Sequence, residues 1–324
     1  MIHRRTFGAA AAVLLALAGP AAAQVQTTLT HSSAASGHYG VATQAFKEHV
    51  EKGTNGRYRV MVQRNDNERE TIESVQLGTQ EFTMISSGPL GNFVPEVRVF
   101  DIPFLFRDYA HARGVLDSPI GQEILAKFPA RGLVGLAWME NGFRHVTTGK
   151  REISSPADMK GLKIRTMENP VHMRAFQALG ALPTPMAFSE LPPALQQGTV
   201  DGQENPISVI LPNNFNQIQS NLILTGHVYS PGIALASPAF MAKLSPEDRA
   251  VFQEAARVAV RTNRNKVEAD ERDGVDELRR RGMNVRTDVD RAAFQAAMGS
   301  IMPAYEREFG ADLLRRIRDW KPAA

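Results

Sequence analysis

The sequence contains no cysteine among its 324 residues, so neither disulfide bonds nor thiolate chemistry contributes to this protein. It also contains no internal repeat and no low-complexity linker. Beyond the first residues, no stretch of about 18 uncharged apolar residues occurs, and we therefore expect no membrane-spanning helix in the mature chain. With 43% hydrophobic residues the chain can bury a large core, and its length predicts two domains.

An excess of charge of either sign is also lacking. If an N-terminal segment carrying Arg4 and Arg5 is removed, two positive charges are lost and the formal net charge falls from +3 to +1. The sequence pI is about 9.2, but acidic and basic residues are interspersed and form no basic patch. We therefore expect no nucleic-acid partner.

Catalytic and metal-binding motifs are missing as well. We find no G-x-S-x-G, no H-E-x-x-H and no phosphate-binding G-x-x-x-x-G-K-[ST]. The eight histidines, which include His31, His38 and His49, contain no pair with the helical spacing of a zinc site. We therefore expect no cofactor, no metal and no enzymatic activity.

The N-terminus has the pattern of an export signal. In MIHRRTFGAAAAVLLALAGPAAAQ two arginines precede an Ala/Leu-rich run that ends in small residues before Gln24. This predicts a signal peptide over residues 1–23, cleaved after Ala23, and a periplasmic mature protein. The segment from Arg4 to Phe7 also fits the twin-arginine pattern, although the ordinary secretion route is favoured.

Apolar runs with strand and helix character alternate along the chain, which predicts an α/β fold with a mostly parallel sheet. We interpret it as two lobes: residues 24–142 plus 231–270, and residues 143–230 plus 271–324. More than one strand crossing between them would make a hinge. Strands are expected at 57–63, 82–86, 132–139, 143–148, 162–166, 200–203 and 232–237. Helices are expected at 42–50, 70–77 and 170–179, and a short helix is opened by Ser189 and Glu190.

A long helix is predicted near the C-terminus. The run from Ser245 to Asp248 combines a capping serine, a proline at the first helical position and two acids. A helix over 248–281 would be roughly 50 Å long at 1.5 Å per residue, which is enough to brace both lobes. Segments 290–309 and 311–320 have the pattern of amphipathic helices.

Three sequence blocks are specific enough to indicate a family. They are D-M-K-G-L-K-I-R (158–165), P-T-P-M-A-F-S-E (183–190) and V-D-G-Q-E-N-P (200–206). In this order they closely resemble the DctP-like solute-binding proteins of tripartite ATP-independent periplasmic (TRAP) transporters, and the resemblance extends over about residues 28–314. It implies a periplasmic-binding-protein-like fold whose lobes close on a small organic acid, which is then delivered to the membrane permease subunits. We expect a monomer. The alternatives to this function are a secreted bilobal enzyme and a periplasmic ligand sensor, each acting on a similar anion.

The resemblance also implies an anion anchor. Arg165, at the end of a short apolar strand, matches the arginine that pairs with a ligand carboxylate, and a planar guanidinium fits a carboxylate with two parallel hydrogen bonds. The alternative is a purely structural pair with an acid such as Glu168. Arg144 matches a second arginine that contacts the ligand, and here the alternative is a salt bridge at the rim of the site.

Four further site residues follow from the same matches. Asn205 corresponds to an amide that hydrogen-bonds the ligand, and Phe188 to an aromatic that packs against it, although by default such a phenylalanine would belong to the core. Glu68 and Ser86 fall where relatives place polar groups that choose among ligands. The alternative for these two is a solvated loop.

The chain departs from the pattern of its relatives at two places, and both concern specificity more than fold. Segment 63–68 lacks the usual Pro- and Gly-rich turn. Pro192 or Pro193 stands where many relatives have tyrosine, and proline is tolerated there only in a first helical turn. The sequence leaves the ligand open among monocarboxylates, keto acids, sugar acids and dicarboxylates.

Overall fold

The computed structural model describes residues 24–322, so the predicted signal peptide lies outside the described residues. Within that range the strands form a single mixed sheet in the order β2-β1-β3-β8-β4-β7-β5-β6, with β9 paired to β8. No helix in the described range has the length and apolar character needed to cross a membrane. The strands are β1 Val25–His31, β2 Tyr58–Arg64, β3 Phe82–Ser86, β4 Val134–Thr148, β5 Lys163–Thr166, β6 Leu182–Pro185, β7 Gly202–Asn205, β8 Asn221–Ala236 and β9 Asn284–Arg286.

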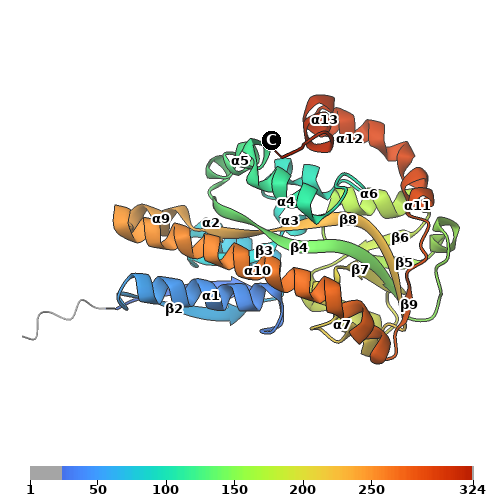
Figure 1. Ribbon diagram of the computed structural model, residues 1–324, viewed down its shortest axis with the longest axis horizontal. Coiled ribbons are helices and arrows are strands. Elements are labelled where there is room, and N and C mark those ends of the chain that lie inside the picture. The colour runs from blue at the N-terminus through green and yellow to red at the C-terminus, as the bar shows by residue number, and fades with distance from the viewer. Residues whose placement is uncertain (1–23, 323–324) are drawn as a thin grey trace, which may run out of the picture.

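Helices cover both faces of this sheet (Figure 1). Most predicted helices are present, with ends shifted by a few residues. The helices are α1 His38–Gly53, α2 Glu68–Leu77, α3 Ser87–Leu90, α4 Tyr109–Asp117, α5 Pro119–Leu125, α6 Pro170–Ala178, α7 Leu191–Gln196, α8 Ile207–Ile210, α9 Pro238–Lys243, α10 Pro246–Arg280, α11 Arg291–Ala297, α12 Met302–Phe309 and α13 Ala311–Arg318, with 3₁₀ turns that include η1 Pro95–Asp101 and η4 Phe188–Glu190.

The two-lobed fold predicted from the sequence is confirmed, and two long antiparallel strands connect its halves. The half on the left of Figure 1 is built on β1, β2 and β3, and the half on the right on β5, β6 and β7. Strands β4 and β8 pair with each other through both halves. They are the crossing strands that the hinge hypothesis requires.

The prediction of two separate strands at 132–139 and 143–148 was wrong, because both belong to β4. The pairing of β4 with β8 shifts register between Glu140 and Gly142 but continues beyond. Gly142 has φ +123°, a conformation that residues with a side chain rarely adopt, so the ladder bends here without ending. The predicted strand at 232–237 is likewise only the last part of β8, which begins at Asn221 and ends at Ala236.

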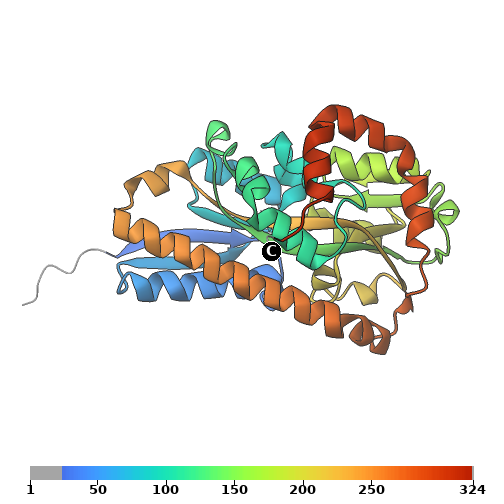
Figure 2. The same ribbon diagram turned by 45° about the horizontal axis from the view of Figure 1, so that its top comes forward.

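Helix α10 crosses both halves, as its length predicted (Figures 1 and 2). Its start has the expected cap, in which the Asp248 amide donates to Ser245 Oγ over 3.1 Å. Where the strands cross, the Asn263 side chain donates to the Glu140 carbonyl (3.0 Å) and accepts from the Glu140 amide (2.7 Å). Further on, Gly274 lies so close to Ile207 of α8 that a Cβ would come within 2.5 Å of its side chain. The helix is thus fixed to both lobes.

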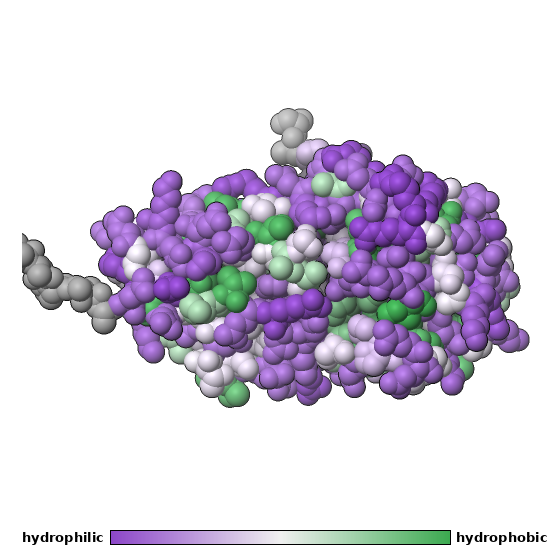
Figure 3. Space-filling model, turned by 90° about the horizontal axis from the view of Figure 1, so that it is seen from below, coloured by the Kyte–Doolittle hydropathy of each residue, from purple (hydrophilic) through white to green (hydrophobic). Residues whose placement is uncertain are grey.

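The C-terminal helices lie on the side of the sheet opposite α10 (Figure 2). We assigned residues 271–324 to the second lobe from the sequence. Tyr305 and Ile317 nevertheless share a hydrophobic cluster with Val115 and Trp138 of the first-lobe range. This segment therefore contacts both lobes, and the lobe boundaries stay a prediction. Polar residues cover most of the face in Figure 3, where hydrophobic side chains occur only in small groups.

Candidate ligand-binding site

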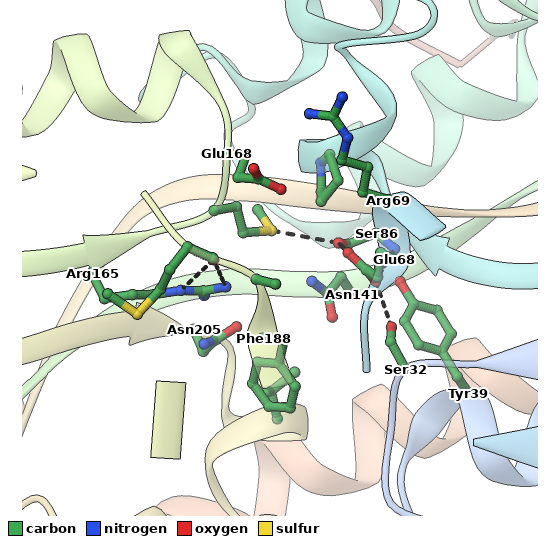
Figure 4. Close-up of a pocket in the computed structure, with 15 residues that line it drawn as sticks. Ser32, Tyr39, Glu68, Arg69, Ser86, Asn141, Arg165, Glu168, Phe188 and Asn205 are labelled. Carbon is green, nitrogen blue, oxygen red and sulfur yellow. Dashed lines mark hydrogen bonds between the residues drawn. The ribbon is translucent and has the colours of Figure 1, made fainter. Parts of the chain in front are cut away.

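A cavity with about 480 Å³ of empty space, its mouth included, lies between the two halves. Five of the six residues predicted from the sequence line it, namely Arg165, Asn205, Phe188, Glu68 and Ser86. Figure 4 shows Arg165, Asn205 and Phe188 on one side and Glu68, Ser86 and their neighbours on the other. The full lining is Ser32, Tyr39, Glu68, Arg69, Ser86, Pro89, Asn141, Arg165, Met167, Glu168, Met186, Ala187, Phe188, Asn205 and Val209.

Arg165 is positioned by β5, which lies between β6 and β7, and only 2% of the residue is exposed. Its Nε and Nη2 donate to the Met186 carbonyl over 3.1 and 2.7 Å (Figure 4). Among residues 24–322, no carboxylate lies within 4.0 Å of the guanidinium, and Nη1 donates to no protein atom. The alternative pairing with Glu168 is thus not formed. Burial lowers the pKa of Arg165 to about 10, which still leaves it charged at neutral pH.

Phe188 and Asn205 stand beside this guanidinium. Phe188 begins the 3₁₀ turn η4 and is half-buried: its ring centroid lies 6.0 Å from Arg165 Cζ and 6.1 Å from the Phe215 ring centroid. One side of the ring therefore faces the cavity and the other packs on the core. Asn205 ends β7, where its Nδ2 donates to Gln203 Oε1. The side chain is buried and held in one orientation.

Arg144 does not line the cavity, although the sequence predicted a ligand contact for it. It is fully buried in β4, where it forms an ion pair with Glu204 and donates from Nη2 to Asn205 Oδ1 over 3.1 Å. Burial acts to raise the pKa of Glu204, but the Arg144 charge and a nearby His227 outweigh it and hold that pKa well below its usual range. The pair is an interior one and not the rim salt bridge of the alternative interpretation. Its observed contact orients Asn205, and ligand contact by Arg144 stays a prediction.

The opposite wall is built around Glu68, the first residue of α2. Its carboxylate accepts hydrogen bonds from the Ser86 amide (2.8 Å), from Ser86 Oγ (2.5 Å) and from Ser32 Oγ (Figure 4). Burial raises the pKa of Glu68, and the bonds from the two serines oppose that shift. In segment 63–68, polar side-chain bonds replace the missing Pro- and Gly-rich turn, since Arg64 pairs with Asp66. The segment thereby places the buried carboxylate of Glu68 in the wall of the cavity.

Sequence reasoning missed Tyr39 and Asn141. The Tyr39 hydroxyl and Asn141 Oδ1 are buried and have no hydrogen-bond partner in the described part of the chain. Leaving a buried polar atom without a partner is costly. A polar group of the ligand placed beside these two atoms would supply the missing hydrogen bonds. Asn141 stands within the E-N-G-F-R run next to the predicted Arg144, which is a signal that could have found it. Tyr39 lies outside every recognised motif.

Pro192 and Pro193 occupy the first turn of α7, which begins at Leu191. This is the position at which the sequence required them, because the amides of a first turn need no partner within the helix. Neither proline lines the cavity. Their effect on specificity stays a prediction.

Known proteins resemble this chain over most of its length. Residues 29–308 match the family described as bacterial extracellular solute-binding protein, family 7 (DctP). A solute-binding protein of Verminephrobacter eiseniae is 52% identical over 301 residues, which cover 92% of this chain and 90% of that protein. The 2,3-diketo-L-gulonate-binding periplasmic protein YiaO of Escherichia coli is 35% identical over 283 residues, covering 86% of each chain.

Solved structures agree with these sequence matches. A TRAP periplasmic solute-binding protein from Polaromonas, bound to D-erythronate, has a TM-score of 0.90 and 50% identity, covering 93% of this chain and all of that one. The galactonate complex of a sugar acid binding protein from Advenella mimigardefordensis has a TM-score of 0.88 and 34% identity, with 91% and 97% covered. Because the family match spans most of the chain and these relatives share its fold, the protein belongs to the DctP family of TRAP transporter solute-binding proteins.

Proposed function

We propose that this protein captures a small hydroxylated monocarboxylate in the cavity between its lobes and delivers it to the permease subunits of a TRAP transporter. The observation that carries the proposal is the guanidinium of Arg165. It is buried, it faces the cavity, and no carboxylate within the described residues pairs with it directly. A ligand carboxylate would supply the missing negative charge.

The energetics support an anion at this position. A buried charge without a partner is costly, whereas a buried pair with good geometry recovers much of that cost. Arg165 is already held in place by the Met186 carbonyl, so little side-chain entropy remains to be lost on binding. Phe188 supplies an apolar surface beside the guanidinium, which limits the access of water to the pair.

The opposite wall supports a hydroxylated tail and disfavours a second carboxylate. Glu68 carries the same charge as a second ligand carboxylate would carry, and the two would repel each other in a confined space of low dielectric. Glu68 can instead accept a hydrogen bond from a ligand hydroxyl. Tyr39 and Asn141 offer further polar atoms without partners on the same side. This pattern suits the sugar acids bound by several relatives.

We further infer that the protein binds without catalysis, acts as a monomer and reaches the periplasm through the signal at residues 1–23, by the ordinary or the twin-arginine route. Its relatives are binding proteins of transporters. The alternatives predict different outcomes: an enzyme would convert the acid during incubation, and a sensor gene would neighbour a kinase gene rather than permease genes. We expect the acid to be recovered unchanged and permease genes to be adjacent.

The test is a calorimetric titration of the mature protein with D-erythronate, D-galactonate and succinate. We expect at least one of the two hydroxy acids to bind and to raise the melting temperature. A ligand present at 100 times its dissociation constant adds about 2.7 kcal/mol to the free energy of unfolding. Succinate should bind at least tenfold more weakly. In a Glu68→Gln variant the difference in affinity between the hydroxy acid and succinate should become smaller, because the side chain at position 68 no longer repels the second carboxylate of succinate. Equal or tighter succinate binding by the wild type would contradict the assignment of Glu68.

A further inference from the structure

Asn169 joins two parts of the chain that belong to different lobes. Its Oδ1 accepts from the Val171 amide over 2.9 Å and so caps the start of α6. Its Nδ2 donates to Asp101 Oδ2 over 2.7 Å. Asp101 ends η1 in the first-lobe range, whereas Asn169 lies in the second-lobe range. Oδ1 of Asn169 thus caps helix α6, and Nδ2 of the same side chain forms a hydrogen bond between the lobes.

The acceptor is itself held in place. Ser87 Oγ donates to Asp101 Oδ1 over 2.7 Å, and Ser87 directly follows Ser86 of the cavity wall. On the other side, His172 Nε2 lies 3.8 Å from the same oxygen. Asp101 and Asn169 are both fully buried, and neither lines the cavity. Their hydrogen bond is therefore a fixed interior contact with no direct access to a ligand.

Two residues between the anion anchor and this bond contact the first lobe. Asn169 follows Arg165 by four residues. In between, Met167 Sδ lies 3.4 Å from Ser86 Oγ, and the Glu168 carbonyl accepts from Asn92 Nδ2 over 2.7 Å. A change in the position of Asn169 relative to Asp101 would therefore move Arg165 relative to the opposite wall.

We infer that Asn169 and Asp101 form a positioning pair, which holds the two walls of the cavity at the separation where Arg165 and Glu68 contact the same ligand. Losing one partner of a buried hydrogen bond leaves the other partner buried without compensation. The expected effect on affinity rests on the proposed function. The expected effect on the distance between the lobes does not.

The experiment begins with Asn169→Ser. Serine is as good a cap for α6 as asparagine, but its shorter side chain has no amide group to reach Asp101. The second variant exchanges the pair, Asp101→Asn with Asn169→Asp. It restores an amide-to-carboxylate hydrogen bond in the reverse direction and keeps both the cap and the bond from Ser87. As a control, Asp290→Ser replaces the cap of α11, where the Asp290 side chain accepts from the Ala293 amide, without any contact between the lobes.

The distance between the lobes can be measured directly, because the chain has no cysteine of its own. Spin labels on cysteines placed at the exposed Gln44 and Lys160 report one distance across the cavity. In ligand-free protein we expect Asn169→Ser to broaden and lengthen the distance distribution, and the exchanged pair to restore it. For D-erythronate, or for D-galactonate if that binds more tightly, the affinity should fall about tenfold in Asn169→Ser and recover in the exchange.

The outcomes separate the two claims. An unchanged distribution in Asn169→Ser, or an exchanged pair that folds but restores neither distance nor affinity, would overturn the inference. If Asn169→Ser does not fold, a folded exchanged pair with the wild-type distribution still supports it, and an exchanged pair that also fails to fold counts against it. If the wild type binds no organic acid, the proposed function fails while the distance measurement still decides the positioning role.

Discussion

Replacing Arg165 by lysine keeps the positive charge and removes the planar arrangement of donors. In the structure, Nε and Nη2 are both engaged by the Met186 carbonyl, and Nη1 is left for the cavity. A lysine has one Nζ, which cannot hold Met186 and grip a ligand carboxylate with two parallel bonds at once. The variant should therefore bind the ligand with fewer hydrogen bonds and less well-defined geometry.

The magnitude follows from the bond that is lost. A hydrogen bond to a charged group contributes about 1.5 to 3 kcal/mol, so we expect the dissociation constant to rise by roughly ten- to hundredfold. Stability without ligand should change by less than about 1 kcal/mol. Burial already disfavours the charged form of Arg165, its only hydrogen-bond acceptor among the described residues is a neutral carbonyl, and lysine retains one bond to it.

The assay is calorimetric titration beside thermal unfolding of the same preparations. Arg57→Lys is the matched control, since Arg57 forms a two-pronged pair with Asp248 far from the cavity (2.9 and 2.6 Å) and should leave affinity unchanged. If Arg165 had only a structural role, the substitution would lower stability and spare affinity. Binding by Arg165→Lys within about threefold of wild type, a difference of ~0.65 kcal/mol, would refute the reasoning.

Three other substitutions test separate parts of the account. Phe188→Ala should weaken binding while the ligand-free protein stays folded, and a loss of about 3 to 5 kcal/mol in unfolding free energy would instead place the ring in the core. Asn263→Ala should cost about 1 to 3 kcal/mol in urea unfolding, because the Glu140 backbone loses both partners; no loss would mean that α10 does not need this link. Burial raises the pKa of Asp101 to about 7 against the opposing bonds from Ser87 and Asn169. Between pH 3.8, the ordinary pKa of an aspartate, and about pH 7, the folded state therefore binds more protons than the unfolded state. Over this range the free energy of unfolding of the wild type falls as pH rises, by up to about 1.4 kcal/mol per pH unit. Asp101→Asn lacks this dependence, so its unfolding free energy relative to wild type should increase between pH 5 and pH 8 in guanidinium titrations, and a parallel response of the two proteins would contradict the shifted pKa.

Much of the fold was predictable because its signals are local. The strand at 82–86 has the predicted bounds, and α10 starts one residue after its capping Ser245. The interior of β4 was not predictable in the same way. Residues 140–142 combine polar side chains with a glycine, which locally favours a turn, whereas the pairing with β8 keeps the strand intact through a bend. Long-range pairing overrides local preference there.

In the candidate site, too, local motifs were predictive and long-range contacts were not. Residues inside the recognised blocks, such as Arg165, Phe188 and Asn205, do line the cavity. The motif placed Arg144 in the predicted site. In the structure Arg144 instead lies behind the cavity wall, because it forms an ion pair with the buried Glu204. Tyr39 reaches the cavity because the start of α1 brings its side chain against Gly232 of β8, where a Cβ would come within 2.4 Å of the Tyr39 hydroxyl. No local pattern encodes such an approach between distant segments.

The most direct test of the central claim is a crystal structure of the mature protein with the hydroxy acid that binds most tightly in the titration. The account predicts a ligand carboxylate on the Arg165 guanidinium within about 3 Å, the range of charge-assisted hydrogen bonds, with ligand hydroxyls directed to Glu68, Tyr39 and Asn141. A ligand bound elsewhere, or one in this cavity whose carboxylate lies away from Arg165, would contradict it.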